Sequence, residues 1–244
     1  MNWINKLLRK EKPARPFCSV LVAAAGSSNR MGGGNKLLME LDGIPVLART
    51  LLAVDSAQLV DEIVVAVRES ELLEMAQLCK TYGIRKPVKI VRGGENRLES
   101  VLLAAQACHE NAAFLAVHDG ARPLAEGKLM DSVIRCAYRT NAAAPAVAVK
   151  DTIKIARDGV VECTPDRSTL FAVQTPQVFD AQLLRAALQS ARDDQAAVTD
   201  DCSAVERMGK AVYLIDGSYE NIKITTPEDI ALAEAILRRR EEIR

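Results

Sequence analysis

Residues 20–36 read Val-Leu-Val-Ala-Ala-Ala-Gly-Ser-Ser-Asn-Arg-Met-Gly-Gly-Gly-Asn-Lys. An apolar run typical of a β-strand, Ser19 to Ala25, leads directly into a loop of small residues that carries Arg30 and ends at Lys36. Small residues allow backbone N–H groups to approach a ligand closely, and clusters of such amides bind anions. The two cationic side chains add charge that backbone dipoles alone do not supply. We therefore predict a triphosphate site at the carboxyl end of the first strand of an α/β sheet.

The best-known phosphate-binding motifs do not match this loop. A Walker loop requires Ser or Thr after its lysine, whereas Leu37 follows Lys36. A G-x-G-x-x-G dinucleotide fingerprint is not formed, because Gly26 is followed by Ser27 and Ser28. The alternative is a glycine-rich surface turn, which is the commonest role of glycine. The apolar strand before the loop and the two cations within it favour the phosphate site.

The composition is that of an ordinary globular protein with one α/β domain or two small ones. The 244 residues are 49% hydrophobic and 26% charged, and the formal net charge is +0. Nucleic-acid and anionic-membrane partners usually require a basic excess, so we expect neither. The six cysteines contain no C-x-x-C pair and only two histidines accompany them, which argues against a zinc site. Scattered single thiols are typical of a reduced, cytoplasmic protein.

The first 16 residues differ in character from the rest of the chain. They contain several Lys and Arg around a short apolar portion that is too interrupted for a signal peptide or a membrane span. We predict that residues 1–16 are a basic N-terminal tail, with an amphipathic surface anchor as the alternative. Residues 17–240 are then predicted to form a single domain.

Strand-like and helix-like segments alternate along that domain. The hydrophobic pattern predicts strands at 63–67, 88–91, 114–117, 212–215 and 221–224, and helices at 70–82, 98–108, 182–191 and 199–208. A last helix is predicted to begin with Thr226 as its N-cap and Pro227 as its first residue. This order is typical of a mostly parallel sheet with helices on both faces.

Residues 146–179 interrupt the alternation. They contain short strand-like runs at 147–149, 152–155, 159–161 and 170–173, with Asp158-Gly159 as a turn. This pattern predicts a β-hairpin that protrudes from the main sheet. Because an isolated hairpin is only marginally stable in water, we expect this one to dock on another surface.

Four unusual segments follow predicted strands, namely 26–36, 93–97, 118–123 and 223–225. In an open parallel sheet, ligands bind at the carboxyl ends of the strands. We therefore expect the four segments to converge on one edge of the sheet and to form one site.

These segments and others contain short motifs in a fixed order. The motifs are Ala24-Ala25-Gly26, Arg30-Met31, Lys36, Gly93-Gly94, Arg97, Ser100-Val101, His118-Asp119-Gly120-Ala121-Arg122-Pro123, Asp151-Thr152, Asp166-Arg167, Gln174-Thr175-Pro176-Gln177, Thr199-Asp200 and Asn221 to Asp229. Each motif is weakly specific, but in this order, from about Val20 to Leu237, they resemble the 2-C-methyl-D-erythritol 4-phosphate cytidylyltransferases of isoprenoid synthesis. The resemblance implies a Rossmann-like nucleotidyltransferase fold in which residues 147–173 form a β-arm for dimerisation.

The resemblance also implies a reaction and a role for each matching residue. An oxygen of methylerythritol 4-phosphate attacks the α-phosphorus of CTP, pyrophosphate leaves, and a divalent cation such as Mg²⁺ assists. The implied catalytic residues are Arg30, Lys36, Arg167 and Lys223. The implied nucleotide-binding residues are Ala24, Ala25, Gly26, Arg30, Lys36, Gly94, Glu95, Arg97, Ser100, Asp119, Gly120 and Lys223. The implied acceptor-binding residues are Arg122, Thr152, Arg167, Thr175, Thr199 and Thr225, of which Thr152 and Arg167 belong to the neighbouring subunit of a homodimer.

Asp119 is also the candidate metal ligand, although a helix cap or turn is the alternative for Asp119, and a cap is the alternative for Thr199. We assign no chemical role to His118.

The chain departs from the family pattern at a few positions. Ala23 and Asn35 stand where the family commonly has proline, and Gly120 replaces the usual alanine. The run Gly32-Gly33-Gly34 predicts a loop that becomes ordered only when CTP binds. A cytidylyltransferase for ribitol 5-phosphate or another polyol phosphate shares most of the pattern and is the first alternative. A nucleotide-binding module without catalysis is the second.

Overall fold

The computed structural model describes residues 15–26 and 35–242. Its central feature is a sheet whose core consists of four parallel strands in the order β6, β1, β4, β5. These strands are β1 (Phe17–Ala23), β4 (Glu62–Val67), β5 (Val88–Arg92) and β6 (Ala112–Asp119). Ala23 at the end of β1 pairs with Ala66 of β4 and with Asp119 of β6. The carboxyl ends of three neighbouring strands therefore lie level with one another. Arg30, the run Gly32–Gly34 and most of the N-terminal tail lie outside the described residues.

The sheet continues beyond β6 with strands of both directions. β11 (Gln177–Asp180) runs antiparallel to β6 and to β7 (Ala142–Ala148). β10 (Phe171–Val173) pairs antiparallel with the far end of β7, and β12 (Tyr213–Asp216) pairs with β7 in parallel. Six of the eight strands thus share one direction, which confirms the predicted mostly parallel α/β sheet.

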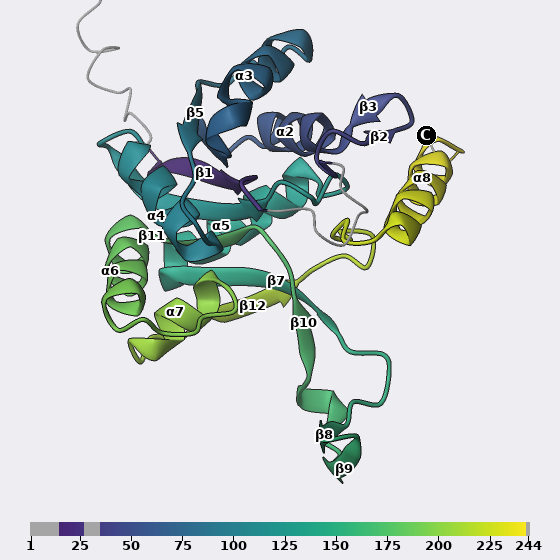
Figure 1. Ribbon diagram of the computed structural model, residues 1–244. Coiled ribbons are helices and arrows are strands. Elements are labelled where there is room, and N and C mark those ends of the chain that lie inside the picture. The colour runs from purple at the N-terminus through teal and green to yellow at the C-terminus, as the bar shows by residue number, and fades with distance from the viewer. Residues whose placement is uncertain (1–14, 27–34, 243–244) are drawn as a thin grey trace, which may run out of the picture.

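Helices cover both faces of this sheet, as predicted (Figure 1). One face packs against α2 (Val46–Ser56), α3 (Leu72–Thr81), α5 (Gly127–Thr140) and α8 (Pro227–Glu242). The other packs against α4 (Arg97–Ala107), α6 (Ala181–Asp193) and α7 (Asp201–Arg207). Successive residues of β1 alternate between the two cores, with Val20 and Val22 in the first and Leu21 in the second. The continuous apolar run therefore identifies a strand that is buried on both sides.

The predicted hairpin is confirmed. β8 (Ile155–Arg157) and β9 (Val160–Cys163) pair antiparallel around Asp158 and Gly159, both of which have positive φ angles. They lie at the end of a long extension between β7 and β10, away from the main sheet (Figure 1). Apolar side chains of the arm, residues 147–173, are exposed, namely Ile153, Ile155, Val160, Val161, Phe171 and Val173. The arm therefore presents an apolar surface that the described part of its own chain does not cover.

The strand predicted at residues 221–224 is wrong. This segment is irregular, although Asn221 and Ile224 are buried. The Asn221 side chain donates hydrogen bonds to the Gln174 side chain at 3.2 Å and to the Thr175 carbonyl at 3.0 Å. The Ile224 N–H donates to the Ala121 carbonyl at 2.8 Å. These bonds to loops take the place of a strand ladder, so Lys223 lies on a loop that is held at both ends.

The remaining elements are short or were not predicted. The strand predicted at 152–155 is also wrong, because strand pairing in this segment begins only at Ile155. The helix predicted at 70–82 begins as a 3₁₀ turn, η2 (Glu69–Glu71), before α3, and the helix predicted at 199–208 begins at Asp201. Helices α2 and α5 and strand β11 had no counterpart in the prediction. The other short elements are β2 (Glu40–Leu41), β3 (Ile44–Pro45) and η3 (Arg167–Thr169).

Candidate functional site

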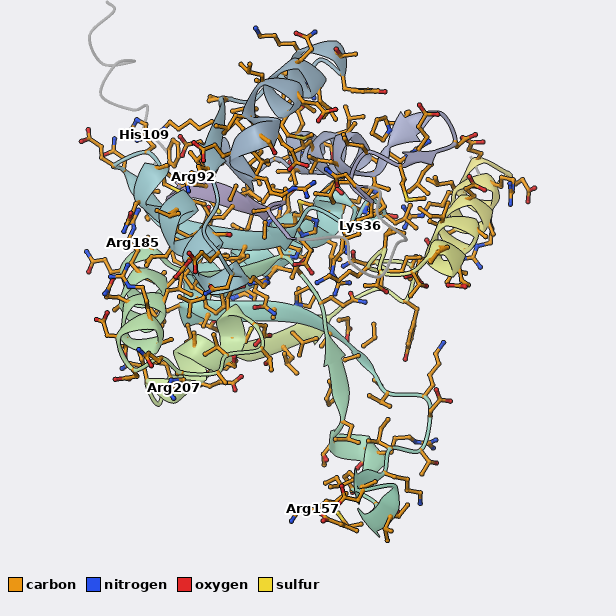
Figure 2. All side chains as sticks on the ribbon, in the orientation of Figure 1. Lys36, Arg92, His109, Arg157, Arg185 and Arg207 are labelled. Atoms are coloured by element: carbon orange, nitrogen blue, oxygen red, sulfur yellow. The ribbon has the colours of Figure 1, made fainter. Side chains whose placement is uncertain are left out.

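A cavity of about 430 Å³ opens at the carboxyl ends of β1, β5 and β6. Its lining comes from all four segments that were expected to converge, so this expectation is confirmed. The lining residues are Ala23, Ala24, Ala25, Gly26, Lys36, Leu37, Gly94, Glu95, Asn96, Arg97, Ser100, Asp119, Ala121 and Lys223. Figure 2 shows Lys36 on the body of the molecule and Arg157 at the tip of the arm, far from it. The sheet edge therefore gathers small residues and cations from distant parts of the sequence into one place.

Close backbone packing forms the floor of this cavity. The Ala24 N–H donates to the Ala66 carbonyl at 2.9 Å, which extends the ladder past the end of β1. A Cβ atom at Gly93 would lie 2.5 Å from the Cβ of Ala25 and 2.9 Å from the Ser100 hydroxyl. Any side chain at position 93 would therefore push apart the two loops that line the cavity.

The loop before α4 is held by the helix that follows it. Asn96 caps α4, because its side chain accepts the Glu99 N–H at 2.9 Å. The Gly94 N–H donates to the Ser100 hydroxyl at 3.1 Å, and the Glu95 N–H donates to the Glu99 carboxylate at 2.8 Å. A Cβ at Gly94 would clash with the Glu99 side chain. The loop is thus preorganised by its own helix, with its edge exposed to the cavity.

Asp119 is the electrostatic centre of the site. Its carboxylate lies 2.9 Å from the Lys223 amino group, 3.4 Å from Arg97 Nη2 and 3.5 Å from Arg122 Nε. Burial alone would raise the pKa of Asp119, but Lys223 and Arg97 together hold it well below its ordinary value. One carboxylate therefore gathers three cations, and two of them, Arg97 and Lys223, line the cavity.

Arg97 is held by a second carboxylate, which lies deeper in the protein. Its Nη1 lies 2.6 Å from an oxygen of Asp201, whose side chain is almost completely buried. Burial raises the pKa of Asp201, although the charge of Arg97 opposes this shift. The backbone N–H of Asp201 donates to the Gln177 side chain at 3.1 Å. Gln177 of β11 thus holds Asp201 at the start of α7, and Asp201 orients the Arg97 guanidinium, which lines the cavity.

Three of the proposed acceptor-binding residues lie beside the cavity lining and form internal hydrogen bonds. The Thr175 hydroxyl accepts the Asp119 N–H at 3.1 Å and lies 3.0 Å from the His118 ring. Arg122 donates to the Asn221 carbonyl at 2.6 Å, and the Thr225 hydroxyl donates to Asp229 at 2.8 Å. These contacts fix the loops around Asp119. Roles for these residues in acceptor binding stay predictions.

Four further proposed site residues also lie outside the cavity lining. Gly120 is buried, and a Cβ there would lie 3.1 Å from the Ala23 carbonyl, so it packs against the end of β1. Thr199 is exposed one residue before Asp200, which is the actual cap of α7. Thr152 and Arg167 lie exposed on the arm, where Arg167 donates to the Lys150 carbonyl at 2.9 Å. Their roles also stay predictions.

Sequence reasoning did not identify several residues that shape the site. Leu37, Asn96 and Ala121 line the cavity, and Asp201 orients Arg97 from behind. The pair Asp200-Asp201 at the start of a predicted helix is recognisable in the sequence and indicates a helix cap at Asp200. It does not show which way the Asp201 side chain points.

Buried His118 predicts a specific pH dependence of stability. Burial lowers the pKa of His118 to about 4, below the value of about 6.5 in an unfolded chain. The unfolded state therefore binds a proton more readily, so the stability contributed by neutral His118 is complete above pH 6.5 and is lost as the pH falls toward 4. Between pH 7 and pH 5 the free energy of unfolding should fall by about 2 kcal/mol from this source.

Urea denaturation at the two pH values measures this difference. His118→Gln should remove most of it, whereas His109→Gln, at an exposed position, should retain it. Equal pH dependence in both variants would contradict the assignment.

The described residues form neither a metal-binding cluster nor a membrane-spanning helix. Within residues 15–26 and 35–242, no three His, Cys, Asp or Glu side chains gather closely enough to hold a metal ion by themselves. None of the helices in the described part of the chain is long and apolar enough to cross a membrane.

Comparison with known proteins identifies the family. The model of the 2-C-methyl-D-erythritol 4-phosphate cytidylyltransferase family matches residues 18–239. A protein of that name from Halalkalibacterium halodurans is 44% identical over 225 residues, which cover 91% of this chain and 98% of the relative. One from Caldanaerobacter subterraneus is 43% identical over 225 residues, with coverage of 91% and 99%. The crystal structure of 4-diphosphocytidyl-2C-methyl-D-erythritol synthase from Anaerococcus prevotii is similar with a TM-score of 0.82 and 32% identity, covering 91% of this chain and 96% of that one. With its fold, its motifs and nearly its whole length in agreement, the chain belongs to the 2-C-methyl-D-erythritol 4-phosphate cytidylyltransferase family.

Proposed function

We propose that the protein transfers CMP from CTP to 2-C-methyl-D-erythritol 4-phosphate, giving 4-diphosphocytidyl-2-C-methyl-D-erythritol and pyrophosphate. The observation that carries this proposal is the cavity at the strand ends, where Lys36, Arg97 and Lys223 surround a space lined by small residues. Membership of the cytidylyltransferase family supports the same reaction. The protein is thus a nucleotidyltransferase of the isoprenoid pathway that starts from methylerythritol phosphate.

The chemistry requires positioning and positive charge more than proton transfer. An oxygen of the acceptor phosphate is already ionised at neutral pH, so it attacks the α-phosphorus without a general base. As the P–O bond to the leaving pyrophosphate breaks, negative charge grows on the equatorial oxygens and on the leaving group. Cations fixed in place before the reaction stabilise this charge without reorganisation.

Each cation has a distinct place in this scheme. Lys36, together with Arg30 of the same loop, binds the triphosphate and stabilises the leaving group. Lys223, held beside Asp119, contacts the α-phosphate and the incoming acceptor phosphate. The small residues Ala24, Ala25 and Gly94 let the backbone approach the flat cytosine ring, and Glu95 and Ser100 belong to the same cavity lining.

The residues of the site fit a Mg²⁺ ion that arrives with the nucleotide. Mg²⁺ commonly binds one or two carboxylates and completes its shell with water and substrate phosphates. Asp119 offers one carboxylate in the cavity lining. Its oxygens already contact three cationic groups, so it would supply a single ligand to an ion whose other ligands come from water and the triphosphate. When bound, the ion neutralises phosphate charge, and Asp119 is the residue that would hold it.

We also propose a cytoplasmic homodimer joined through the arm. All six cysteines are free thiols, as a reducing compartment would keep them. The exposed apolar side chains of the arm support burial against a second copy of this chain. In such a dimer, Thr152 and Arg167 contact the acceptor phosphate in the partner's cavity, where the planar guanidinium of Arg167 can bond two phosphate oxygens.

Pyrophosphate release tests the reaction. Purified protein is mixed with CTP and Mg²⁺ in parallel with 2-C-methyl-D-erythritol 4-phosphate and with ribitol 5-phosphate. Release with the first acceptor supports the proposal, and preference is measured as the ratio of kcat/KM values. Release with ribitol phosphate alone retains the chemistry and overturns the acceptor. CTP binding without pyrophosphate release in the presence of either acceptor would favour a binding module.

Mixing two inactive variants tests the shared site. Lys223→Ala and Arg167→Ala should each lose most activity alone. After unfolding and refolding together at equal amounts, about half of the dimers combine one of each. In those dimers one of the two cavities contains both intact residues, so about a quarter of the wild-type activity should return. No recovery, with dimers verified by light scattering, would place Arg167 in its own subunit's cavity or in no cavity.

A further inference from the structure

The residue before Lys36 is fixed by bonds on two sides. The side-chain amide of Asn35 donates to Glu71 Oε1 at 2.6 Å, while its side-chain oxygen accepts the Leu37 N–H at 3.1 Å. The Asn35 carbonyl accepts the Leu38 N–H at 3.0 Å. The two bonds within residues 35–38 are those of a local turn. The bond from Asn35 to Glu71 is additional and connects this turn to a distant part of the sequence.

Glu71 provides a firm attachment point. Its side chain is buried, with 7% of the residue exposed, and it ends the 3₁₀ turn η2 that follows strand β4. The last residue of that strand, Val67, pairs with Arg92 and accepts the Gly93 N–H at 2.8 Å, which ties this edge to the floor of the cavity. The bond from Asn35 therefore joins the chain entering the cavity at Lys36 to the edge of the central sheet.

Arg68 makes this attachment compatible with a phosphate site. Its guanidinium forms an ion pair with the same Glu71 oxygen, three residues away. A buried carboxylate is costly unless it is paired and hydrogen-bonded, and Arg68 and Asn35 together satisfy it. Because Arg68 neutralises Glu71, the attachment brings no net negative charge to an edge that must accept a triphosphate.

We propose that Asn35 and Glu71 form a clamp that positions Lys36 for the triphosphate of CTP. The inference rests on the proposed function, and it goes further by naming two positioning residues. Asn35 immediately precedes Lys36, which lines the cavity, so the bonds that hold Asn35 also set the direction in which the chain carries Lys36. Leu37, on the other side of Lys36, is buried, and its carbonyl accepts the Leu47 N–H.

Exchange of the donor and the acceptor tests the clamp. Asn35→Asp replaces the donor by a second carboxylate facing Glu71, so the two groups repel each other. Combining it with Glu71→Gln restores a donor opposite an acceptor and still allows residue 35 to accept the Leu37 N–H. The affinity for CTP is measured by calorimetry without acceptor, and the unfolding midpoint of the nucleotide-free protein is measured in parallel.

Asn35→Asp should weaken CTP binding by on the order of tenfold, since a small displacement of a positioned group is enough to cost this much. The double variant should recover most of the affinity. Asn111→Asp makes the same charge change at an exposed position and should bind like the wild type. The clamp would be overturned if the double variant did not recover its affinity for CTP. It would also be overturned if the unfolding midpoint changed in parallel with the CTP affinity across all variants. Because the measurement uses CTP alone, an incorrect acceptor assignment does not affect it.

Discussion

Lys223→Met should lower kcat/KM for cytidylyl transfer by on the order of a hundredfold to a thousandfold. Methionine retains most of the length of the side chain and removes the charged amino group with its hydrogen-bond donors. The Lys223 amino group lies 2.9 Å from Asp119, and its side chain is 41% exposed, so its charge faces the cavity without being enclosed. A cation held there by a buried carboxylate needs little movement to meet the α-phosphate, and its loss should be felt most in the transition state.

Steady-state pyrophosphate release, measured against both substrates, separates the possible effects. A fall in kcat with a nearly unchanged KM for CTP would assign Lys223 to transition-state stabilisation. A higher KM with unchanged kcat would assign it to ground-state binding and contradict the proposed role. Lys128→Met is the matched control, because Lys128 is exposed on the first turn of α5 and should retain wild-type kinetics.

The sequence predicts the parallel part of the sheet well because burial on both faces leaves a continuous apolar run. Strands β4 and β5 match their predictions to within a residue or two. The same reasoning failed at residues 221–224, where Asn-Ile-Lys-Ile alternates like a strand. Whether Asn221 pairs along a ladder or bonds to Gln174 and Thr175 depends on residues more than 40 positions away. Local periodicity contains no information about such a choice.

The candidate site was likewise predicted only in part from the sequence. Glycine-rich and cationic segments that follow strands are visible in a sequence, and topology brings their backbones together. The partners that orient the cations are not visible. Arg97 and Asp201 are 104 positions apart, and Asn35 and Glu71 are 36 positions apart. Each pair depends on which way a side chain points at the start of a helix or turn, and this is decided by the packed structure.

Asp119→Asn should destabilise the protein and also reduce its activity. The carboxylate is buried against Arg97, Arg122 and Lys223. Loss of its negative charge leaves three neighbouring cationic groups whose mutual repulsion it no longer offsets. Removing one partner of a buried charge cluster costs about 3 kcal/mol of unfolding free energy. Arg97 keeps its bond to Asp201, and Lys223 can turn toward solvent, so the loss should fall mainly on Arg122.

The pH dependence and the effect of CTP give this prediction its sharpest test. The neighbouring cations lower the pKa of Asp119 below its unfolded value of about 3.9, so its stabilisation is complete above that pH and is lost as the pH falls through the lower folded value. The stability difference between wild type and Asp119→Asn should therefore be constant from pH 5 to 8 and should narrow below pH 4.

CTP carries the negative charge that the variant lacks. At equal fractional saturation, CTP should therefore raise the unfolding midpoint of the variant at least as much as that of the wild type. Asp216→Asn, at an exposed position on β12, should change neither quantity. A variant as stable as the wild type at pH 7 would show that the three cations do not depend on Asp119.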